Sequence, residues 1–306
     1  MSERDKKWVV SESFRLFEWL MHIGYEINVI GGKNFQVLNE QPEIPAVLYF
    51  NHITSADPLI MAYLLITYLR NRLGNVIYTV SEDYTKLTGK KPHYIIGVKL
   101  AETVGFYMPR IIQPYRLEDE RLSEKQKKEL GDRSTQLANE FGKLLEEKLP
   151  AGATSVIAPE SHRSEDGSLL PAEKGLGLIV KHSAMRNSRL SLPVGLAFAD
   201  KYNYSRGLNY HPLHPKQINV SIGSPLDYDQ ILAQTQILTG KTEIYSFYDI
   251  SHCLMVQLRD LLPDWMHGFY SQELLARTLN RDFELKMGPG RKPRVFDKST
   301  QNWFSK

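Results

Sequence analysis

A histidine and an aspartate five positions apart are the residues of this sequence best suited to chemistry. His52 and Asp57 lie in the segment NHITSADP, directly after a short apolar run that predicts a strand. We expect Asp57 to be the N-cap of the next helix and Pro58 its first residue. Such a loop can bring the carboxylate to one imidazole nitrogen while the other faces a pocket. The carboxylate would fix the tautomer and stabilise the imidazolium, which makes His52 a candidate general base.

The same spacing has a plainer explanation, because a purely structural Asp57-Pro58 helix cap would look identical. A second polar loop supports the catalytic interpretation. It reads APESHRS (residues 158–164), follows another predicted strand and holds Glu160 and Arg163. An acid and a base at such a place often form only a solvated surface pair. Since the carboxyl ends of parallel strands meet at one edge of a sheet, however, we expect both loops to face one cleft.

Short β-rich runs alternate with helical segments along the chain. Strands are predicted at residues 46–50, 76–80, 110–113, 154–158, 192–198 and 217–222. Helices are predicted at residues 58–72, 123–149, 171–186 and 245–262. This alternation predicts an α/β fold with a mostly parallel mixed sheet flanked by helices. Residues 287–294 (MGPGRKPR) are predicted to be unstructured.

The N-terminal segment predicts an amphipathic helix with a broad apolar side. Projected at 100° per residue, apolar side chains that include Trp8, Phe14, Phe17 and Trp19 cover an arc of about 240°. One explanation is a helix packed against the rest of the domain. The other is a helix that inserts these two Trp and two Phe into one membrane leaflet. The interspersed charges exclude a signal peptide or a transmembrane anchor.

Composition sets the broad class of the protein. The 306 residues are 42% hydrophobic and 24% charged, which is ordinary for a globular protein and excludes a disordered chain. The net charge is +3, but residues 277–306 carry eight Lys and Arg against three Asp and Glu, so this tail is +5 and the remainder is −2. Basicity this local disfavours a nucleic-acid binder and leaves a membrane surface or an anionic ligand. The single cysteine, Cys253, indicates a reducing cytoplasm, and the longest apolar run (residues 59–69) is too short to span a bilayer.

Four motifs in this order resemble those of the glycerolipid acyltransferase superfamily, which includes the lysophosphatidic acid and glycerol-3-phosphate acyltransferases. NHITSADPLI resembles the family's Asn-His-x-Ser/Thr-x-x-Asp block, the HX4D motif, and APESHRS resembles its Phe-Pro-Glu-Gly-Thr-Arg-Ser block. LPV (residues 192–194) and IGSP (residues 222–225) resemble the last two blocks. The resemblance covers roughly residues 29–226.

Two departures from the family pattern affect substrate binding. Ser161 and His162 replace the family's Gly-Thr, which adds bulk where the backbone would approach a phosphate. The second block is the poorest match. We place its arginine at Arg116, with Arg110 as the alternative. A non-catalytic lipid-binding relative that keeps the fold is therefore the alternative to an enzyme.

The resemblance implies an acyltransferase of phospholipid biosynthesis. It would move a fatty acyl group from an acyl thioester, either acyl-CoA or acyl carrier protein, to the hydroxyl of a lysophospholipid. The first candidate acceptor is 1-acyl-glycerol-3-phosphate, and glycerol 3-phosphate is the second. His52 would be the general base and Asp57 would orient it, with a backbone N–H near Pro58 as a hypothesis for the oxyanion donor. The residues expected to bind the acceptor are Arg163, Arg116, Ser161, Lys174 and Glu160, the last by orienting an arginine or the loop.

The resemblance also implies partners and an organisation of the chain. No metal and no cofactor besides the thioester co-substrate is expected. The expected partners are the thioester, a glycerophosphate or lysophospholipid acceptor, an acyl carrier protein and a membrane surface, but no nucleic acid. The protein would be cytoplasmic and peripheral to the membrane. Residues 1–25 would form the N-terminal amphipathic helix, 26–240 the acyltransferase domain, 241–285 a C-terminal helical extension and 286–306 a basic tail.

Overall fold

A seven-stranded sheet, in the order β1-β9-β8-β2-β7-β3-β5, forms the centre of the protein. It is seen in a computed structural model that describes residues 3–81, 101–102, 105–117, 122–160, 163–184, 189–204, 215–240, 246–271, 283–287, 293–297 and 302–305. Neighbouring strands run parallel except for the antiparallel pair β8 and β9. The predicted α/β fold with a mostly parallel mixed sheet is therefore confirmed.

Each strand of the sheet is short. The strands are β1 (Tyr25–Ile30), β2 (Ala46–Phe50), β3 (Val76–Tyr78), β5 (Phe106–Tyr107), β7 (Thr154–Ile157), β8 (Leu190–Phe198) and β9 (Lys216–Ile222). A separate pair is formed by β4 (Val80–Ser81) and β6 (Arg110–Ile111). Every side chain of β2 is buried, as expected of a central strand that is covered on both faces.

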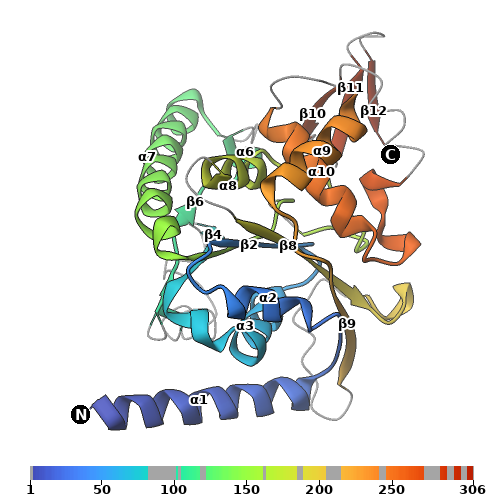
Figure 1. Cartoon of the computed structure of the whole chain (residues 1–306). Coiled ribbons are helices and arrows are strands. Elements are labelled where there is room, and N and C mark those ends of the chain that lie inside the picture. Colours follow the sequence, from blue (N-terminus) through green and yellow to red (C-terminus); the bar gives the residue numbers. More distant parts are fainter. Residues whose placement is uncertain are drawn as a thin grey trace.

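Helices cover both faces of the sheet (Figure 1). One face carries α2 (Asn34–Glu40) and α3 (Asp57–Tyr68), and the other carries α8 (Gly175–Ala184), α9 (Tyr228–Thr239) and α10 (Phe247–Arg259). The short α6 (Pro114–Leu117) precedes the long α7 (Glu124–Lys148), which begins with a capping box at Ser123. The 3-10 turns are η1 (Arg70–Asn75), η2 (Leu149–Ala151), η3 (Lys201–Asn203), η4 (Asp264–Met266) and η5 (Gly268–Tyr270).

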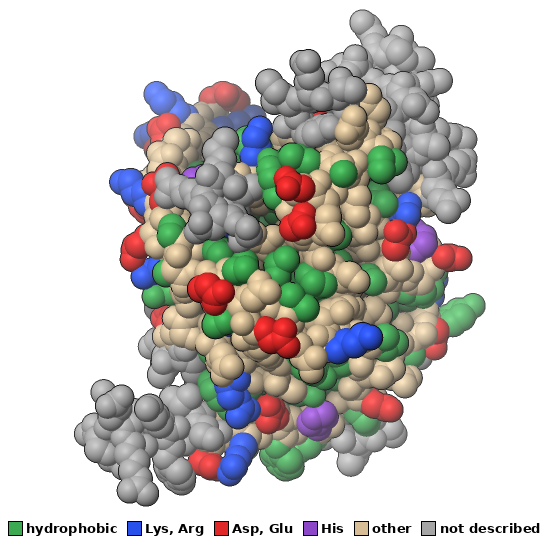
Figure 2. Space-filling model, viewed as in Figure 1, with side chains coloured by type: hydrophobic (Ala, Val, Ile, Leu, Met, Phe, Trp, Pro, Cys, Tyr) green, Lys and Arg blue, Asp and Glu red, His purple; other side chains and the backbone are tan. Residues whose placement is uncertain are grey.

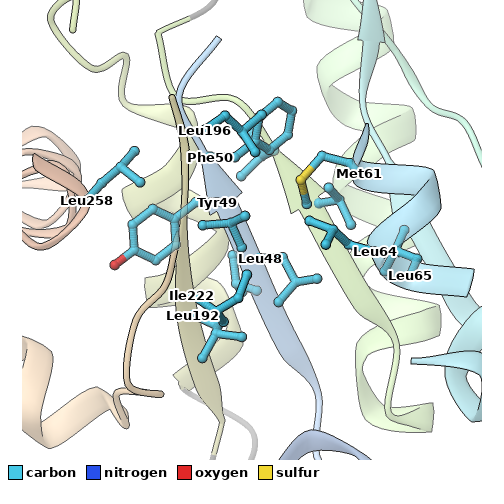
Figure 3. Packing of buried hydrophobic residues seen from close by; sticks show 14 of the residues in the cluster. Leu48, Tyr49, Phe50, Met61, Leu64, Leu65, Leu192, Leu196, Ile222 and Leu258 are labelled. Carbon is cyan, nitrogen blue, oxygen red and sulfur yellow. The ribbon is translucent and has the colours of Figure 1, made fainter. Parts of the chain in front are cut away.

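The core continues from one face of β2 to the other (Figure 3). Leu48 lies toward Leu64 and Leu65 of α3, whereas Tyr49 points toward Leu258 of α10. Because successive side chains of a strand point to opposite faces, one strand anchors both helical layers. Among the described residues, nothing forms a hydrogen bond with the buried hydroxyl of Tyr49.

The helices α8 and α10 pack closely through a glycine. A Cβ on Gly177 would clash with the carbonyl group of Phe247, so only a glycine allows this approach. The N–H of Gly177 donates a hydrogen bond to the hydroxyl of Ser251 (2.8 Å). Side chains of α10 and of η4 and η5, among them Leu254 and Met266, belong to the same hydrophobic core as the sheet. Residues 246–271 are thus packed against the strands.

A buried arginine joins the segments that precede two neighbouring strands, β2 and β7. Arg72 is 3% exposed and donates to oxygen atoms of Leu38 (2.8 Å), Gln41 (2.6 Å), Ile44 (2.9 Å), Gly152 (3.4 Å) and Thr154 (3.2 Å). Burial lowers the pKa of its guanidinium to about 10, so the group stays charged at neutral pH. One side chain therefore connects the segment before β2 to the turn before β7.

The predicted N-terminal helix is present as α1 (Glu3–Gly24), and one of its faces packs on α3. The imidazole of His22 meets the ring of Tyr63 edge-on, with 5.5 Å between the ring centroids. Phe14 is buried beneath the guanidinium of Arg70. Of the two explanations for this helix, packing against the domain therefore holds for Phe14, because α3 covers that side of α1.

The surface of the protein carries charges of both signs. Figure 2 shows one face, on which the described acidic and basic side chains are interspersed with small groups of apolar ones. Some exposed apolar side chains are isolated, such as Ile237, and need no special explanation. Three others, Leu16, Trp19 and Leu20, share one helix and form a candidate interaction surface. No helix within the described residues combines the length and the apolar composition of a membrane span.

The tail differs from its prediction. Antiparallel strands β10 (Phe283–Met287), β11 (Pro293–Asp297) and β12 (Asn302–Ser305) form a small sheet, in which Met287 is paired with Pro293. The prediction of an unstructured 287–294 segment is therefore wrong at both ends, and residues 288–292 lie outside the described ones. Pro293 is the first residue of its strand, a position where the missing N–H is tolerated.

Candidate active site

Two neighbouring strands bring the two polar loops together. β2 and β7 are parallel, with Tyr49 opposite Ile157, so residues 51–57 and 158–164 leave the same edge of the sheet. The N–H of Ser164 donates to the carbonyl oxygen of His52 (3.4 Å). The hydroxyl of Tyr204 donates to the carbonyl oxygen of Ser164 (2.8 Å). The structure thus joins the loops into one site, as expected from the sheet topology.

The His-Asp pair is the centre of this site. Nδ1 of His52 lies 2.8 Å from Oδ2 of Asp57. The Asp57 side chain is fully buried, whereas that of His52 is 20% exposed. The carboxylate therefore orients the ring from behind and fixes the tautomer with a proton on Nδ1. Nε2 is the ring nitrogen left for a bound molecule.

The backbone of the loop holds the Asp57 carboxylate in place. Oδ2 accepts the N–H of Ile53 (2.7 Å), and Oδ1 accepts the N–H of Thr54 (3.1 Å). Burial raises the pKa of Asp57, and the bonds from His52 and from these two N–H groups oppose that rise. Together these contacts lock the carboxylate under the imidazole.

The prediction that Asp57 is the N-cap of α3 is wrong. It is the first helical residue, and Ala56 occupies the cap position without a side-chain hydrogen bond. The physical reason is that the carboxylate turns back over its own loop, where His52 and two N–H groups bind it. Pro58 is therefore the second residue of the helix, one position later than predicted.

The first turn of α3 uses its N–H groups internally. The N–H of Ala56 donates to the hydroxyl of Thr54 (3.3 Å), and the N–H of Asp57 donates to the carbonyl oxygen of Thr54 (3.3 Å). Leu59 and Ile60 donate to the carbonyl oxygen of Ala56, at 2.8 and 3.0 Å. These four groups already have acceptors, so they do not support the hypothesis of an oxyanion donor at the helix start.

Glu160 supports the backbone of the loop that carries His52. Its Oε2 accepts the N–H of His52 (2.6 Å), and its Oε1 accepts the N–H of Leu170 (2.7 Å). The residue is 2% exposed. Of the two roles expected for Glu160, the geometry favours orientation of the loop, since both carboxyl oxygens are used within the protein.

Replacing Glu160 by glutamine is expected to remove a pH dependence of stability. Burial raises the pKa of Glu160 to about 8 from about 4.5, against the opposing effect of its two N–H bonds. The folded protein therefore holds this proton more tightly, so the stabilisation is full below pH 4.5 and is lost as the pH rises through 8. Between these pH values, the unfolding free energy of the wild type minus that of Glu160→Gln should fall by up to about 1.4 kcal/mol per pH unit.

Denaturant titrations at several pH values measure this difference, and Glu165→Gln is the matched control. Glu165 is an exposed carboxyl on the same loop, and its replacement should leave the pH profile unchanged. A wild-type minus Glu160→Gln difference that stays constant across the range would contradict the prediction.

The other predicted binding residues have different placements. Arg163 is partly buried and donates a hydrogen bond to the hydroxyl of Ser55, which links the two loops. Ser161 lies outside the described residues. Arg116 is in α6, and Lys174 is exposed just before α8. Within the described part of the chain, no contact places Arg116 or Lys174 at the His-Asp pair, so their binding roles stay predictions.

Three residues that the sequence did not single out also hold the site. Asn51 exchanges two hydrogen bonds with the backbone of Leu196, at 2.8 and 2.7 Å, and so ties the loop to β8. Tyr204 bridges the loops, because its hydroxyl lies 3.1 Å from the carbonyl oxygen of Ile53 and 2.8 Å from that of Ser164. Tyr78 is buried near Asp57, and burial first and that carboxylate second raise the pKa of its phenol. Asn51 belongs to the first motif, whereas no pattern marked Tyr204 or Tyr78.

The fold and the site define an α/β protein with a buried carboxylate and an accessible imidazole at the carboxyl edge of its sheet. Across the described ranges, no three His, Cys, Asp or Glu side chains are grouped as a metal site. A search of solved structures finds similarity to the crystal structure of the 1-acyl-sn-glycerophosphate (LPA) acyltransferase, PlsC, from Thermotoga maritima. The match has a TM-score of 0.44 and 16% identity, and it covers 85% of this chain and 83% of that chain. No protein-family model and no curated protein matches the sequence.

Proposed function

We propose that the protein is an acyltransferase that moves a fatty acyl group from an acyl thioester to the hydroxyl of a lysophospholipid. The observation that carries the proposal is the contact between His52 and Asp57, 2.8 Å long, with the carboxylate buried and the imidazole accessible. This arrangement is suited to a general base whose carboxylate partner stabilises the imidazolium. The motif resemblance supports the choice of acyl transfer among the reactions that such a base can assist.

The reaction needs only the movement of one proton by the protein. Nε2 of His52 takes the proton of the acceptor hydroxyl while the hydroxyl oxygen attacks the thioester carbonyl carbon. The new C–O bond forms, and the resulting intermediate then breaks its C–S bond. The departing thiolate receives the proton from the imidazolium. The products are the ester and the free thiol, and no covalent bond to the enzyme forms.

The acceptor phosphate is proposed to bind beside the pair. Arg163 is held at the junction of the two loops through Ser55, and a guanidinium can bind a phosphate through paired N–H donors. Ser161, Arg116 and Lys174 are the further proposed contacts. We infer 1-acyl-glycerol-3-phosphate as the first candidate acceptor and glycerol 3-phosphate as the second.

A thiol-release assay tests the proposal and its main alternative. Long-chain acyl-CoA and acyl carrier protein serve as donors, and each is offered with 1-acyl-glycerol-3-phosphate, glycerol 3-phosphate or no acceptor. We expect thiol release that depends on the acceptor, together with formation of the acylated product. Binding of lipid without thiol release from any pair would instead favour a non-catalytic lipid-binding protein.

A membrane surface is the proposed location, on the cytoplasmic side. Leu16, Trp19 and Leu20 are 56%, 58% and 41% exposed, and their spacing places them together on α1. The opposite face of α1 packs on α3, so the helix is anchored to the fold while these three side chains stay partly exposed. Apolar and indole side chains on one helix face are suited to the boundary between lipid headgroups and acyl chains.

Replacing Leu16, Trp19 and Leu20 together by serine is expected to weaken binding to anionic phospholipid vesicles by about tenfold or more. A tenfold change is about 1.4 kcal/mol, well below the transfer free energy of three large apolar side chains. Vesicle sedimentation measures the partition. Ile237→Ser is the matched control, because Ile237 is 84% exposed on another helix. Equal binding by the triple variant and the wild type would show that these three side chains of α1 do not contribute to membrane binding.

A further inference from the structure

The segment 169–172 is hydrogen-bonded to η4 and η5. The N–H of Leu169 donates to the carbonyl oxygen of Met266 (2.7 Å), and the N–H of Phe269 donates to the carbonyl oxygen of Leu169 (3.0 Å). The N–H of Ala172 donates to the hydroxyl of Tyr270 (3.0 Å). All five residues are at most 8% exposed, so water does not compete well for these bonds. This segment is therefore fixed by residues that follow the acyltransferase motifs in the sequence.

The same segment is linked by hydrogen bonds to the loop that carries His52. The N–H of Leu170 donates to Oε1 of Glu160 (2.7 Å), and Oε2 of the same carboxyl accepts the N–H of His52 (2.6 Å). The N–H of Glu173 donates to the carbonyl oxygen of Pro159 (2.9 Å). A displacement of segment 169–172 would consequently be transmitted to the position of the His52 backbone.

Close backbone approach makes this connection rigid. Gly268 has a φ of +49° and lies against Leu169, so that a Cβ would clash with the Leu169 carbonyl oxygen. Gly167 has a φ of +82°, and a Cβ there would lie 2.9 Å from the Tyr204 ring and 3.0 Å from the Trp265 ring. Only glycine adopts such conformations readily, and here it also provides the space.

A partly buried histidine fixes the hydroxyl of Tyr270. Nδ1 of His252, in α10, lies 2.7 Å from that hydroxyl. Because the phenol oxygen already accepts the N–H of Ala172, its proton is directed to His252. Burial lowers the pKa of His252 to about 4, so the ring is neutral and its Nδ1 accepts. Burial also raises the pKa of Tyr270, which keeps its donor proton in place.

We propose that Tyr270 and His252 are positioning residues for His52, acting through segment 169–172 and the Glu160 carboxyl. Neither residue lies in a motif of the first 226 positions, and neither is placed in contact with substrate. The effect on turnover rests on the proposed function, whereas the effect on the position of His52 does not. Residues 246–271 thus help to position His52.

Tyr270→Phe tests the proposal, with Tyr49→Phe as the matched control. Tyr270→Phe keeps the ring but removes the acceptor of the Ala172 N–H. Tyr49→Phe removes a buried hydroxyl that makes no hydrogen bond within the described residues. The first readout is the NMR resonance of the His52 backbone N–H, whose short bond to Glu160 makes it sensitive to this geometry. The second is the separation of kcat from KM in the thiol-release assay.

We expect Tyr270→Phe to shift the His52 resonance and to lower kcat about tenfold, since small misplacements of a catalytic group have large effects on rate. KM for both substrates should stay within about twofold, and Tyr49→Phe should change neither readout. A folded Tyr270→Phe protein with a wild-type resonance and wild-type kcat would overturn the proposal. A shifted resonance in a protein whose wild type releases no thiol would support the positioning role and count against the proposed function.

A second pair of variants covers the case that Tyr270→Phe does not fold. His252→Gln retains an oxygen that can accept the Tyr270 proton, whereas His252→Phe does not. The resonance of the His52 N–H should be closer to that of the wild type in the glutamine variant than in the phenylalanine variant. Identical spectra of the two variants at this position would contradict the role of His252.

Discussion

Replacing His52 by alanine is expected to lower kcat of acyl transfer by about 10²- to 10⁴-fold, the usual contribution of a positioned general base. The ring is bound through Nδ1 to Asp57, so its Nε2 is the group that would take the proton of the acceptor. The fold should survive the change, because the His52 side chain is partly exposed. Initial rates of thiol release with saturating acyl-CoA and acceptor measure the effect.

Two further measurements make this result specific. Free imidazole should restore part of the activity of His52→Ala, because it can occupy the space of the missing ring. Asp57→Asn should also reduce kcat, since the amide no longer provides the negative charge beneath the imidazolium. Turnover by His52→Ala at the wild-type rate would exclude the proposed mechanism, whatever the effect of imidazole.

Replacing Arg72 by methionine is expected to lower the unfolding free energy by about 4 kcal/mol or more. The guanidinium donates to five buried or partly buried oxygens around β2, and a methionine leaves them without this partner. Each buried group that loses its hydrogen bond costs about 1–3 kcal/mol, reduced where the backbone relaxes or water enters. Such a loss is a large fraction of the ~5–15 kcal/mol that stabilises a typical domain.

Urea unfolding measures this loss, and a neighbouring arginine provides the control. Arg70 is exposed, and its contacts include a surface ion pair with Glu18, the ring of Phe14 and a hydrogen bond to the carbonyl oxygen of Ile66 (3.4 Å). Arg70→Met should therefore change stability by about 1 kcal/mol or less. Arg72→Lys should recover only part of the lost stability, because one ammonium has three donors in place of five. Equal losses from Arg70→Met and Arg72→Met would refute the interpretation of Arg72 as a structural centre.

The sheet could be predicted where apolar runs are long enough to be recognised. Residues 46–50 were predicted as a strand and form β2 with the same ends, and the neighbouring β7 was also anticipated. β6 (Arg110–Ile111) lies within the strand predicted at 110–113, whereas the two-residue β5 was not predicted and depends on its pairing with β3. Local sequence carries little information on such pairings.

The contact between His52 and Asp57 could be predicted from their spacing in the sequence, but the hydrogen bonds that orient the Asp57 carboxylate could not. His52 and Asp57 meet as predicted, yet the direction of the carboxylate depends on N–H groups of the loop rather than of the helix. No sequence pattern marked Arg72 as a buried residue, because an isolated arginine is usually a surface residue. The bond between Tyr270 and Ala172 likewise joins positions that no motif connects.

The antiparallel pairing of β8 with β9 has a consequence for how amphiphilic substrates would arrive. Because β1 is parallel to β9, it begins on the side of the sheet toward which the carboxyl end of β2 points, and its register places Ile30 near the level of Phe50 and Tyr25 further out on that side. α1 ends directly before Tyr25, and Trp19 is about 8 Å from that end at a rise of about 1.5 Å per residue. On the proposed membrane docking, the lysophospholipid acceptor would reach His52 by lateral diffusion within one leaflet, so the encounter would depend on its surface density rather than on its concentration in water.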